Sequence, residues 1–263
     1  RVVHASADAP AVNAGLDGVD QVTGLEFASA TDFLTVGAGD YDVTVDGILT
    51  DGSTANVIDA PGVSLDADAE TSIIAVGNVA DGSISPVVVS APDEDPDSAS
   101  VRAQVVHASA AAAPAGELDV YVTAPAETLA AASPLGSFEF EGTIGPATVP
   151  AGDYRIRLTP AGDSATVLFD SGTVPLAGGS DLLIAAIDNT GPANGPRGAP
   201  IRLLVAPEGG SSFLILDEGA QAAVRAAHLS ADAGAVDVSV DGINNDAPVV
   251  TGLTFDNPPF SDN

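Results

Sequence analysis

RVVHASADAP (residues 1–10) returns as QVVHASAAAAP (104–114) and as RAAHLSADAG (225–234). Self-similarity of this kind is the mark of repeated structural units, so these stretches organise the rest of the sequence. Each copy carries one histidine, and these repeat anchors are His4, His107 and His228. The chain is therefore expected to consist of tandem copies of one domain.

A second pair of anchors supports the repeat. GAGDYDVTV at 37–45 is matched by PAGDYRIRL at 150–158, which makes Tyr41 and Tyr154 corresponding residues. Apolar and polar residues alternate after each tyrosine, as in a strand with one buried face. The glycine of each AGD triplet can adopt a positive φ, so it is predicted to lie in a tight hairpin turn.

The remaining sequence favours short strands over helices. Among 263 residues there are 28 Gly and 19 Pro, and the short aliphatic runs are bounded by Gly, Pro, Asp and Ser. Short strands at intervals of about ten residues are typical of antiparallel sandwiches. The sequence thus predicts an all-β chain of tandem antiparallel β-sandwich domains, two complete and a third partial.

Composition changes place the domain boundaries. We expect repeat 1 at 1–92, an acidic linker at 93–100, repeat 2 at 101–218 and repeat 3 at 219–263. The linker belongs to the stretch SAPDEDPDSAS, which has turn formers and acids but no hydrophobic periodicity.

The charge of the chain restricts its partners. Its net charge is −30, and all seven basic residues are arginine. A polyanion repels phosphates, so we expect neither nucleic-acid binding nor attachment to anionic membranes. The run LLIAAI at 182–187 is too short to cross a bilayer, so no membrane insertion is expected. No methionine occurs and residue 1 is Arg, so we expect an upstream leader and secretion to a saline extracellular setting or the cell surface.

A family resemblance follows from these motifs. The pattern V-V-H-A-S-x-D-A-P, then an L/V-D-G hairpin, then A-G-D-Y before an alternating strand, resembles the bacterial secreted domain of unknown function 4397. Repeat 2 departs from it at Ala111, and repeat 3 departs at Ala227 and Leu229. The resemblance implies immunoglobulin-like sandwiches in exported, surface-associated proteins, and it supplies no catalytic residues.

The histidine stretch also admits a catalytic reading. In a strand, His4, Ser6 and Asp8 would point to one face, as a hydrolase nucleophile and its base would require. Repeat 2 has Ala111 in the place of the acid. We therefore expect no enzyme, and each histidine is predicted to close a strand end by hydrogen bonding to the backbone.

The acidic run is the candidate ion site, with Asp93, Asp95 and Asp97 as the potential calcium ligands. Oxygen ligands at alternate positions are typical of calcium loops, but Ser98 and Gln104 stand where the loop glycine and glutamate belong. A solvated acidic spacer is the favoured alternative. No other cofactor is expected. The tyrosines are expected to serve the fold, with sugar stacking as the alternative.

Repeat 3 is the clue to function. It carries VTGLTF at 250–255, which matches VTGLEF at 22–27, yet it spans only 219–263. Such a fragment could continue beyond the chain, pack back on repeat 2, or be completed by another subunit. The last option predicts an extracellular structural protein whose copies assemble head-to-tail into a fibre or coat. The alternative is a cell-surface adhesin or a glycan- or calcium-binding module.

Overall fold

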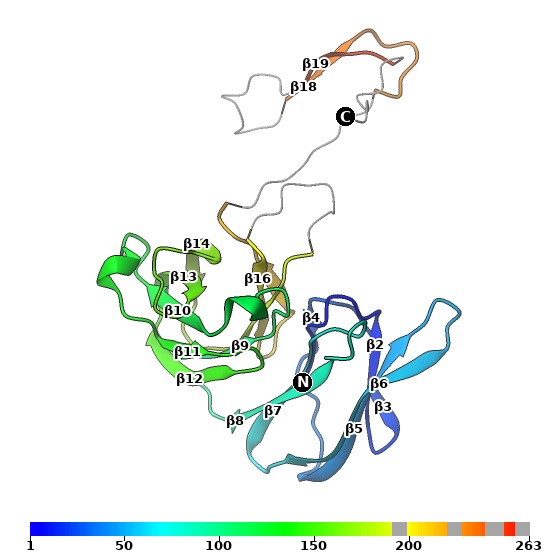
Figure 1. Ribbon diagram of the computed structural model, residues 1–263, viewed down its shortest axis with the longest axis vertical. Coiled ribbons are helices and arrows are strands. Elements are labelled where there is room, and N and C mark those ends of the chain that lie inside the picture. The colour runs from blue at the N-terminus through cyan, green and yellow to red at the C-terminus, as the bar shows by residue number, and fades with distance from the viewer. Residues whose placement is uncertain (191–198, 220–227, 240–249, 256–263) are drawn as a thin grey trace. The chain divides into compact units, whose positions relative to one another are not determined.

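The computed structural model describes residues 1–190, 199–219, 228–239 and 250–255 (Figure 1). Within these ranges the chain is all-β, and its helical segments are two 3-10 turns, η1 (Ala113–Ala115) and η2 (Leu129–Ala131). None of these described helical turns has the length and hydropathy that a membrane crossing requires. Residues 1–220 form one compact unit and residues 221–263 a second.

Repeat 1 is built from eight strands in two sheets. The strands are β1 (Val2–His4), β2 (Val12–Leu16), β3 (Val19–Leu25), β4 (Ser29–Ala30), β5 (Gly39–Ile48), β6 (Thr54–Leu65), β7 (Ala69–Val76) and β8 (Ser85–Pro92). The outer sheet has the order β3-β2-β5-β6, and the inner sheet has the order β4-β1-β7-β8. The two sheets enclose a small core of Val, Ala and Ile side chains, so repeat 1 is a sandwich-like unit.

Repeat 2 follows the same plan. Its strands are β9 (Ser100–His107), β10 (Leu118–Thr123), β11 (Gly136–Phe138), β12 (Thr143–Pro150), β13 (Gly152–Pro160), β14 (Phe169–Leu176), β15 (Ser180–Asp188), β16 (Ile201–Pro207) and β17 (Phe213–Ile215). The inner sheet has the order β12-β9-β15-β16-β17, and the outer sheet has the order β11-β10-β13-β14. Its core is larger than that of repeat 1 and includes Phe138 and Phe169.

The inner sheets of the two repeats pack against each other through a third core. Repeat 1 contributes Val3, Ala5 and Ile74 among others, and repeat 2 contributes Ile187 and Leu204 among others. Each inner sheet therefore has two buried faces. This explains why the run at 182–187 is continuously apolar, since a strand buried on both faces loses the alternation of a half-exposed strand.

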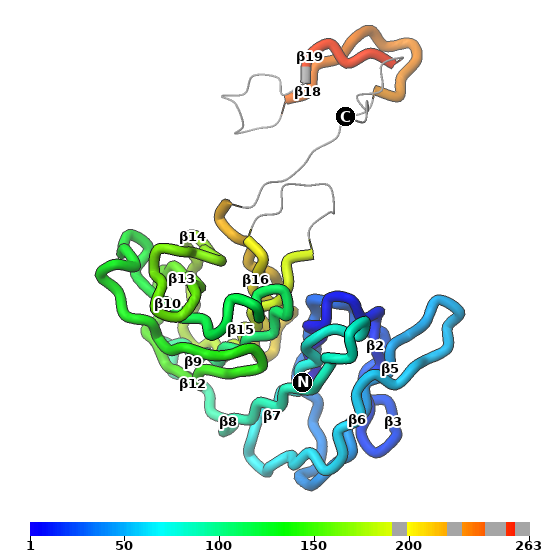
Figure 2. The backbone as a smooth tube through the Cα atoms, in the orientation of Figure 1, coloured from blue at the N-terminus to red at the C-terminus, as the bar shows by residue number. Residues whose placement is uncertain are grey.

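The acidic stretch leads directly from one inner sheet into the other. The backbone passes from β8 through residues 93–99 into β9 (Figure 2), and Ser100, the last residue of the predicted linker, is the first residue of β9. The Asp93 amide donates to the carbonyl of Asp68, and the Gly179 amide donates to that of Asp97. The stretch is thus tied at both ends to the turns that precede β7 and β15.

The predicted hairpin turn at the AGD glycines is wrong. Gly39 and Gly152 are the first residues of β5 and β13, with φ near +158° and +159°. In repeat 2, the connection before Gly152 carries the chain from β12 in the inner sheet to β13 in the outer sheet. The glycines therefore begin strands at a crossing between sheets, where an almost extended backbone is needed.

Repeat 3 has two described strands, β18 (Val236–Val238) and β19 (Val250–Leu253), which pair antiparallel. They correspond to β2 and β3 of repeat 1. The amide of Gly252 donates to the side chain of Asp237 as that of Gly24 donates to Asn13. The strand register of β2 and β3 is therefore reproduced in repeat 3, since Val236 pairs with Leu253 as Val12 pairs with Leu25.

The core between the inner sheets should couple the stabilities of repeats 1 and 2. Leu204→Ala, at a side chain only 1% exposed, should lower the free energy of unfolding by about 2–5 kcal/mol. Because the core is shared, both repeats should unfold in one shifted transition when urea denaturation is followed. The control is Leu214→Ala, at the residue that pairs with Leu204 but is 38% exposed. A loss confined to repeat 2 would contradict the coupling.

Candidate functional site

His4 and His107 are the last residues of β1 and β9, and His228 lies just before the turn at 231–233. His4 and His107 are completely buried and His228 is nearly so. The Nε2 atom of His4 lies 2.9 Å from the carbonyl oxygen of Pro10, and that of His228 lies 2.9 Å from the carbonyl oxygen of Gly234. The rings of His4 and His228 therefore donate to a carbonyl six residues ahead, whereas Nε2 of His107 is buried and has no hydrogen-bond partner among the described residues.

The other ring nitrogen accepts a backbone hydrogen bond in repeats 2 and 3. The amides of Ser109 and Ser230 donate to Nδ1 of His107 and His228, at 3.3 and 3.2 Å. His107 also lies 5.4 Å from the ring centre of Phe138 and 5.7 Å from that of Phe140. Burial in these surroundings lowers the pKa of His107 to about 4, so this imidazole is neutral at physiological pH.

A serine–carboxylate pair accompanies each histidine. The Ser6 hydroxyl lies 3.4 Å from Asp8, and the Ser230 hydroxyl donates to Asp232 at 2.6 Å. In repeat 2, where Ala111 replaces the aspartate, Ser109 donates instead to Asp188, at the end of β15. Comparing the repeats in the sequence did not reveal Asp188, because this residue lies far from the repeated motif in the chain.

The exchange of carboxylates has a steric cause. The strand registers place Gly77 of repeat 1 at the position of Asp188. Gly77 has φ +80°, and a Cβ there would lie 2.3 Å from the carbonyl oxygen of Ser83. No carboxylate can stand at that position in repeat 1, so Asp8 supplies it from the other side. Asp8 accepts the amides of Val79 and Ala80.

This geometry does not prepare the serines for nucleophilic attack. Among the described residues, no serine hydroxyl donates to a histidine, and the hydroxyl protons point to carboxylates instead. A general base must lie within hydrogen-bonding reach of the proton that it removes. The serine, the carboxylate and the histidine together fasten the loop to the strand end.

Tyr41 and Tyr154 are held in the same way. The Tyr41 hydroxyl donates to the carbonyl of Gly37, and the Tyr154 hydroxyl donates to the carbonyl of Pro150, both at 2.8 Å. Each tyrosine thus ties its strand to the carbonyl four residues earlier, across the AGD triplet.

The three linker aspartates are not brought together by the fold. Within the described residues, one set of three carboxylates has ligand atoms within 4.8 Å of one another, and its members are Glu70, Asp181 and Glu208. Asp97 instead accepts the amide of Ala99 and shapes the turn before β9. The predicted calcium site at Asp93, Asp95 and Asp97 therefore has no geometric counterpart in the described structure.

The carboxylate set lies where the two repeats meet. Arg102 of β9 donates to Asp181 and, at 2.9 Å, to Glu70. Its side chain is 8% exposed, so the ion pairs are shielded from water. Burial, together with the charges of Asp181 and Glu208, raises the pKa of Glu70 to about 7. The charges of Arg102 and Arg1 lower the pKa of Glu70, but burial and the two other carboxylates outweigh them.

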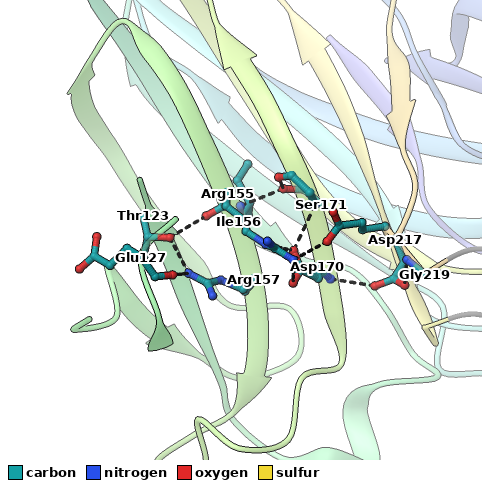
Figure 3. A network of polar contacts seen from close by, with 11 residues as sticks. Thr123, Glu127, Arg155, Ile156, Arg157, Asp170, Ser171, Asp217 and Gly219 are labelled. Carbon is teal, nitrogen blue, oxygen red and sulfur yellow. Dashed lines mark hydrogen bonds and ion pairs between the residues drawn. The ribbon is translucent and has the colours of Figure 1, made fainter. Parts of the chain in front are cut away.

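A second arginine network fixes the segment that leaves repeat 2 (Figure 3). Arg155 of β13 donates to both carboxylate oxygens of Asp170 at 2.7 and 2.8 Å, and it also pairs with Glu218. The Asp170 amide donates to Asp217 at 2.8 Å, and the Asp217 side chain accepts the amide of Gly219. The last residues of repeat 2 are therefore bound to the outer sheet.

A cleft of about 500 Å³ lies mainly in repeat 1. Its lining includes the apolar residues Leu16, Val43 and Ile73 and the acidic residues Glu70 and Glu208. The Arg1 guanidinium lies 3.9 Å from the ring centre of Phe33, also in the lining. Clefts of this size and mixed polarity are typical of ligand sites.

The neutral state of His107 should make stability depend on pH. The folded protein takes up this proton less readily than the unfolded chain, whose histidines titrate near pH 6.5. The stabilisation is therefore present above about pH 6.5 and is lost as the pH falls towards about 4. His107→Gln should reduce the slope of unfolding free energy against pH by up to about 1.4 kcal/mol per unit in urea titrations. An unchanged slope would contradict the assignment.

Comparison with known proteins agrees with the repeat structure. No curated protein matches the chain. The family model described as domain of unknown function (DUF4397) matches residues 1–121 and again residues 111–239. Each matched segment runs past the next anchor histidine, His107 in the first match and His228 in the second. The chain belongs to the DUF4397 family and contains two tandem copies of its domain.

Proposed function

We propose that the chain is an extracellular structural protein whose copies assemble head-to-tail into a surface fibre or coat. The observation that carries this proposal is the exposure of apolar residues in repeat 3. Leu229 is 84% exposed and Val236 is 37% exposed, whereas the corresponding residues of repeat 1, Ala5 and Val12, are 2% and 1% exposed. Large exposed apolar side chains at positions that are buried in sister repeats indicate a contact surface.

The position of Leu229 supports one particular kind of contact. Its counterparts Ala5 and Ala108 both lie in the core between the inner sheets of repeats 1 and 2. The residue after the anchor histidine is thus the place where one repeat packs on the next. We infer that repeat 3 uses this position against a further repeat of another copy, a heterologous contact that propagates when it does not close a ring.

The composition is consistent with such a role. A net charge of −30 keeps free subunits soluble and apart, and salt screens their repulsion. The immunoglobulin-like topology implied by the family pattern is part of the same proposal. It is supported by the pairing of two four-stranded sheets around one core in repeat 1.

Self-association should depend on Leu229. In about 1 M salt, where the Debye length is about 3 Å, the 263-residue chain should sediment as a concentration-dependent series of oligomers and form filaments in negative stain. Leu229→Asp should weaken association at least about tenfold, because it places a charge in an apolar contact.

The matched control is Ala231→Asp, which adds the same charge at another exposed residue of repeat 3. It should leave association unchanged. A wild-type chain that stays monomeric under these conditions would overturn the proposed function.

A surface binding module for calcium or glycans is the second candidate, and the cleft of repeat 1 with its acidic lining favours it. If calcium binds there, Glu70→Gln should remove the heat of calcium binding in calorimetry, whereas Asp95→Asn should not. Because the pKa of Glu70 is about 7, binding should weaken as the pH falls below that value and the carboxylate becomes protonated. Calcium heat that survives Glu70→Gln would exclude this site.

A further inference from the structure

The last strand of repeat 2, β17, forms a sheet edge that repeat 1 lacks. It pairs with β16 and with no other described strand, so its second side is open in the described structure. The strand of repeat 1 that corresponds to β16 is β8, since each pairs antiparallel with the central strand of its inner sheet. The sheet of repeat 1 ends at β8. The shared plan of the two repeats therefore does not account for β17.

This strand exposes large apolar side chains to water. Phe213 is 51% exposed, Leu214 is 38% exposed, and Leu216, which follows the strand, is 53% exposed. In the described residues of repeats 1 and 2, no other stretch of four residues carries three such side chains. Single exposed apolar residues are ordinary on a protein surface, but contiguous ones indicate a contact with another molecule.

The exposed side chains lie on both faces of the inner sheet. Leu214 pairs with Leu204, whose side chain belongs to the core between the repeats. Phe213 pairs with Val205, whose side chain belongs to the core of repeat 2. Directly opposite residues of neighbouring strands point to the same side of a sheet. A strand that continued the sheet beyond β17 would therefore lie at the margins of both cores, and it would need apolar side chains on both faces.

The edge at β17 lacks the features by which sheet edges avoid pairing. Prolines remove backbone donors from an edge strand, and charged side chains repel a second chain. The edge strand β8 carries Pro86 and Pro92, and the edge strand β12 carries Pro146 and Pro150. The stretch GGSSFLIL at 209–216 contains neither a proline nor a charge. The edge at β17 is thus open to pairing in a way that these two edges are not.

Hydrogen bonds hold β17 at both ends. Before the strand, the hydroxyl oxygen of Ser212 accepts the amide of Ala30 at 3.1 Å, which ties the strand to repeat 1. After the strand, Asp217 accepts the amide of Asp170, and the amide of Glu218 donates to the carbonyl of Asp170. An edge that is already ordered loses little conformational entropy on pairing, so these bonds prepare the strand for a partner.

Charge determines which partner fits this edge. The chain has a net charge of −30, so two copies repel each other over most of their surfaces. The stretch around β17 is uncharged, and of the acids that follow it, Asp217 accepts backbone amides and Glu218 pairs with Arg155. Two copies therefore meet with less repulsion here than elsewhere. The edge requires an uncharged strand that is apolar on both faces, and β17 itself is such a strand.

We propose that β17 pairs antiparallel with β17 of a second copy across a twofold axis, which joins the two inner sheets of repeat 2 into one continuous sheet. Both copies use the same surface, so the contact is isologous and closes as a pair. The pair goes beyond the proposed head-to-tail assembly, because it uses repeat 2 and not repeat 3. Where both contacts form, each line of subunits is joined to another.

Disulfide crosslinking tests the symmetry of the pair. The chain has no cysteine, so a single introduced cysteine can form a disulfide only with the same residue of another copy. In an antiparallel pair across a twofold axis, one residue of the strand lies opposite its own counterpart, at a distance that a disulfide spans. In about 1 M salt, one variant of the scan should therefore oxidise to a covalent dimer, whereas Val167→Cys, at a 44% exposed control residue, should not. The scan consists of Phe213→Cys, Leu214→Cys, Ile215→Cys and Leu216→Cys.

Sedimentation tests the strength of the pair. The Leu229→Asp chain, which lacks the proposed head-to-tail contact, should still form dimers in about 1 M salt. Adding Phe213→Asp should weaken this dimer at least about tenfold, because both copies then carry a carboxylate at the paired edge. Adding Val167→Asp instead introduces the same charge away from β17 and should leave the dimer unchanged. Urea denaturation of the dilute Phe213→Asp chain checks that the loss of dimer does not come from unfolding.

The outcomes separate this pair from the head-to-tail assembly. A wild-type chain that forms dimers but no larger species, and loses them with Phe213→Asp, would support the β17 pair and overturn the proposed function. Larger oligomers that Phe213→Asp leaves unchanged would overturn the β17 pair and leave the head-to-tail assembly standing, and so would a failure of every cysteine at 213–216 to crosslink. A wild-type chain that stays monomeric in about 1 M salt would overturn both.

Discussion

The face-to-face packing of the two inner sheets is the constraint on which the rest of residues 1–219 depends. Because each inner sheet is covered by an outer sheet on one side and by its sister on the other, its strands must be apolar on both faces. Small residues such as Ala5 and Ala108 allow close approach at this core. Repeats 1 and 2 therefore form a stack of four sheets rather than two separate sandwiches joined only by a linker.

The same packing determines where charge can be buried. In a chain with seven arginines and 37 acids, Arg102 is placed between the repeats and divides its hydrogen bonds between Glu70 of one and Asp181 of the other. Breaking such a pair would leave a buried charge without a partner. The acidic side chains thus lie mainly at the surface. Arginines form ion pairs where segments of the chain meet, as Arg155 does with Asp170 and Glu218 at the end of repeat 2.

The anchor motif shows how a repeated structure tolerates sequence change. Every repeat keeps a buried histidine and, two residues later, a serine bound to a carboxylate, but the carboxylate comes from Asp8, Asp188 or Asp232. What persists is the fastening of a loop that would otherwise have unpaired polar groups beside a buried strand. Since the serine hydroxyls donate to carboxylates and not to the imidazoles, the motif holds the loop after the histidine in place. The proposed function relies instead on the exposed positions of repeat 3.

The sequence by itself determined the all-β class and the tandem repeats, because strand alternation and self-similarity are local properties that survive without knowledge of contacts. It also located the anchor histidines and tyrosines. It could not reveal that the inner sheets pack together, that Asp188 replaces an absent aspartate, or that Glu70, Asp181 and Glu208 converge, since these pairings join residues far apart in the chain. The linker aspartates looked like ligands because they are adjacent in sequence, but ligands must converge in space. The cleft was equally invisible, because its lining residues come from strands and loops far apart in the chain.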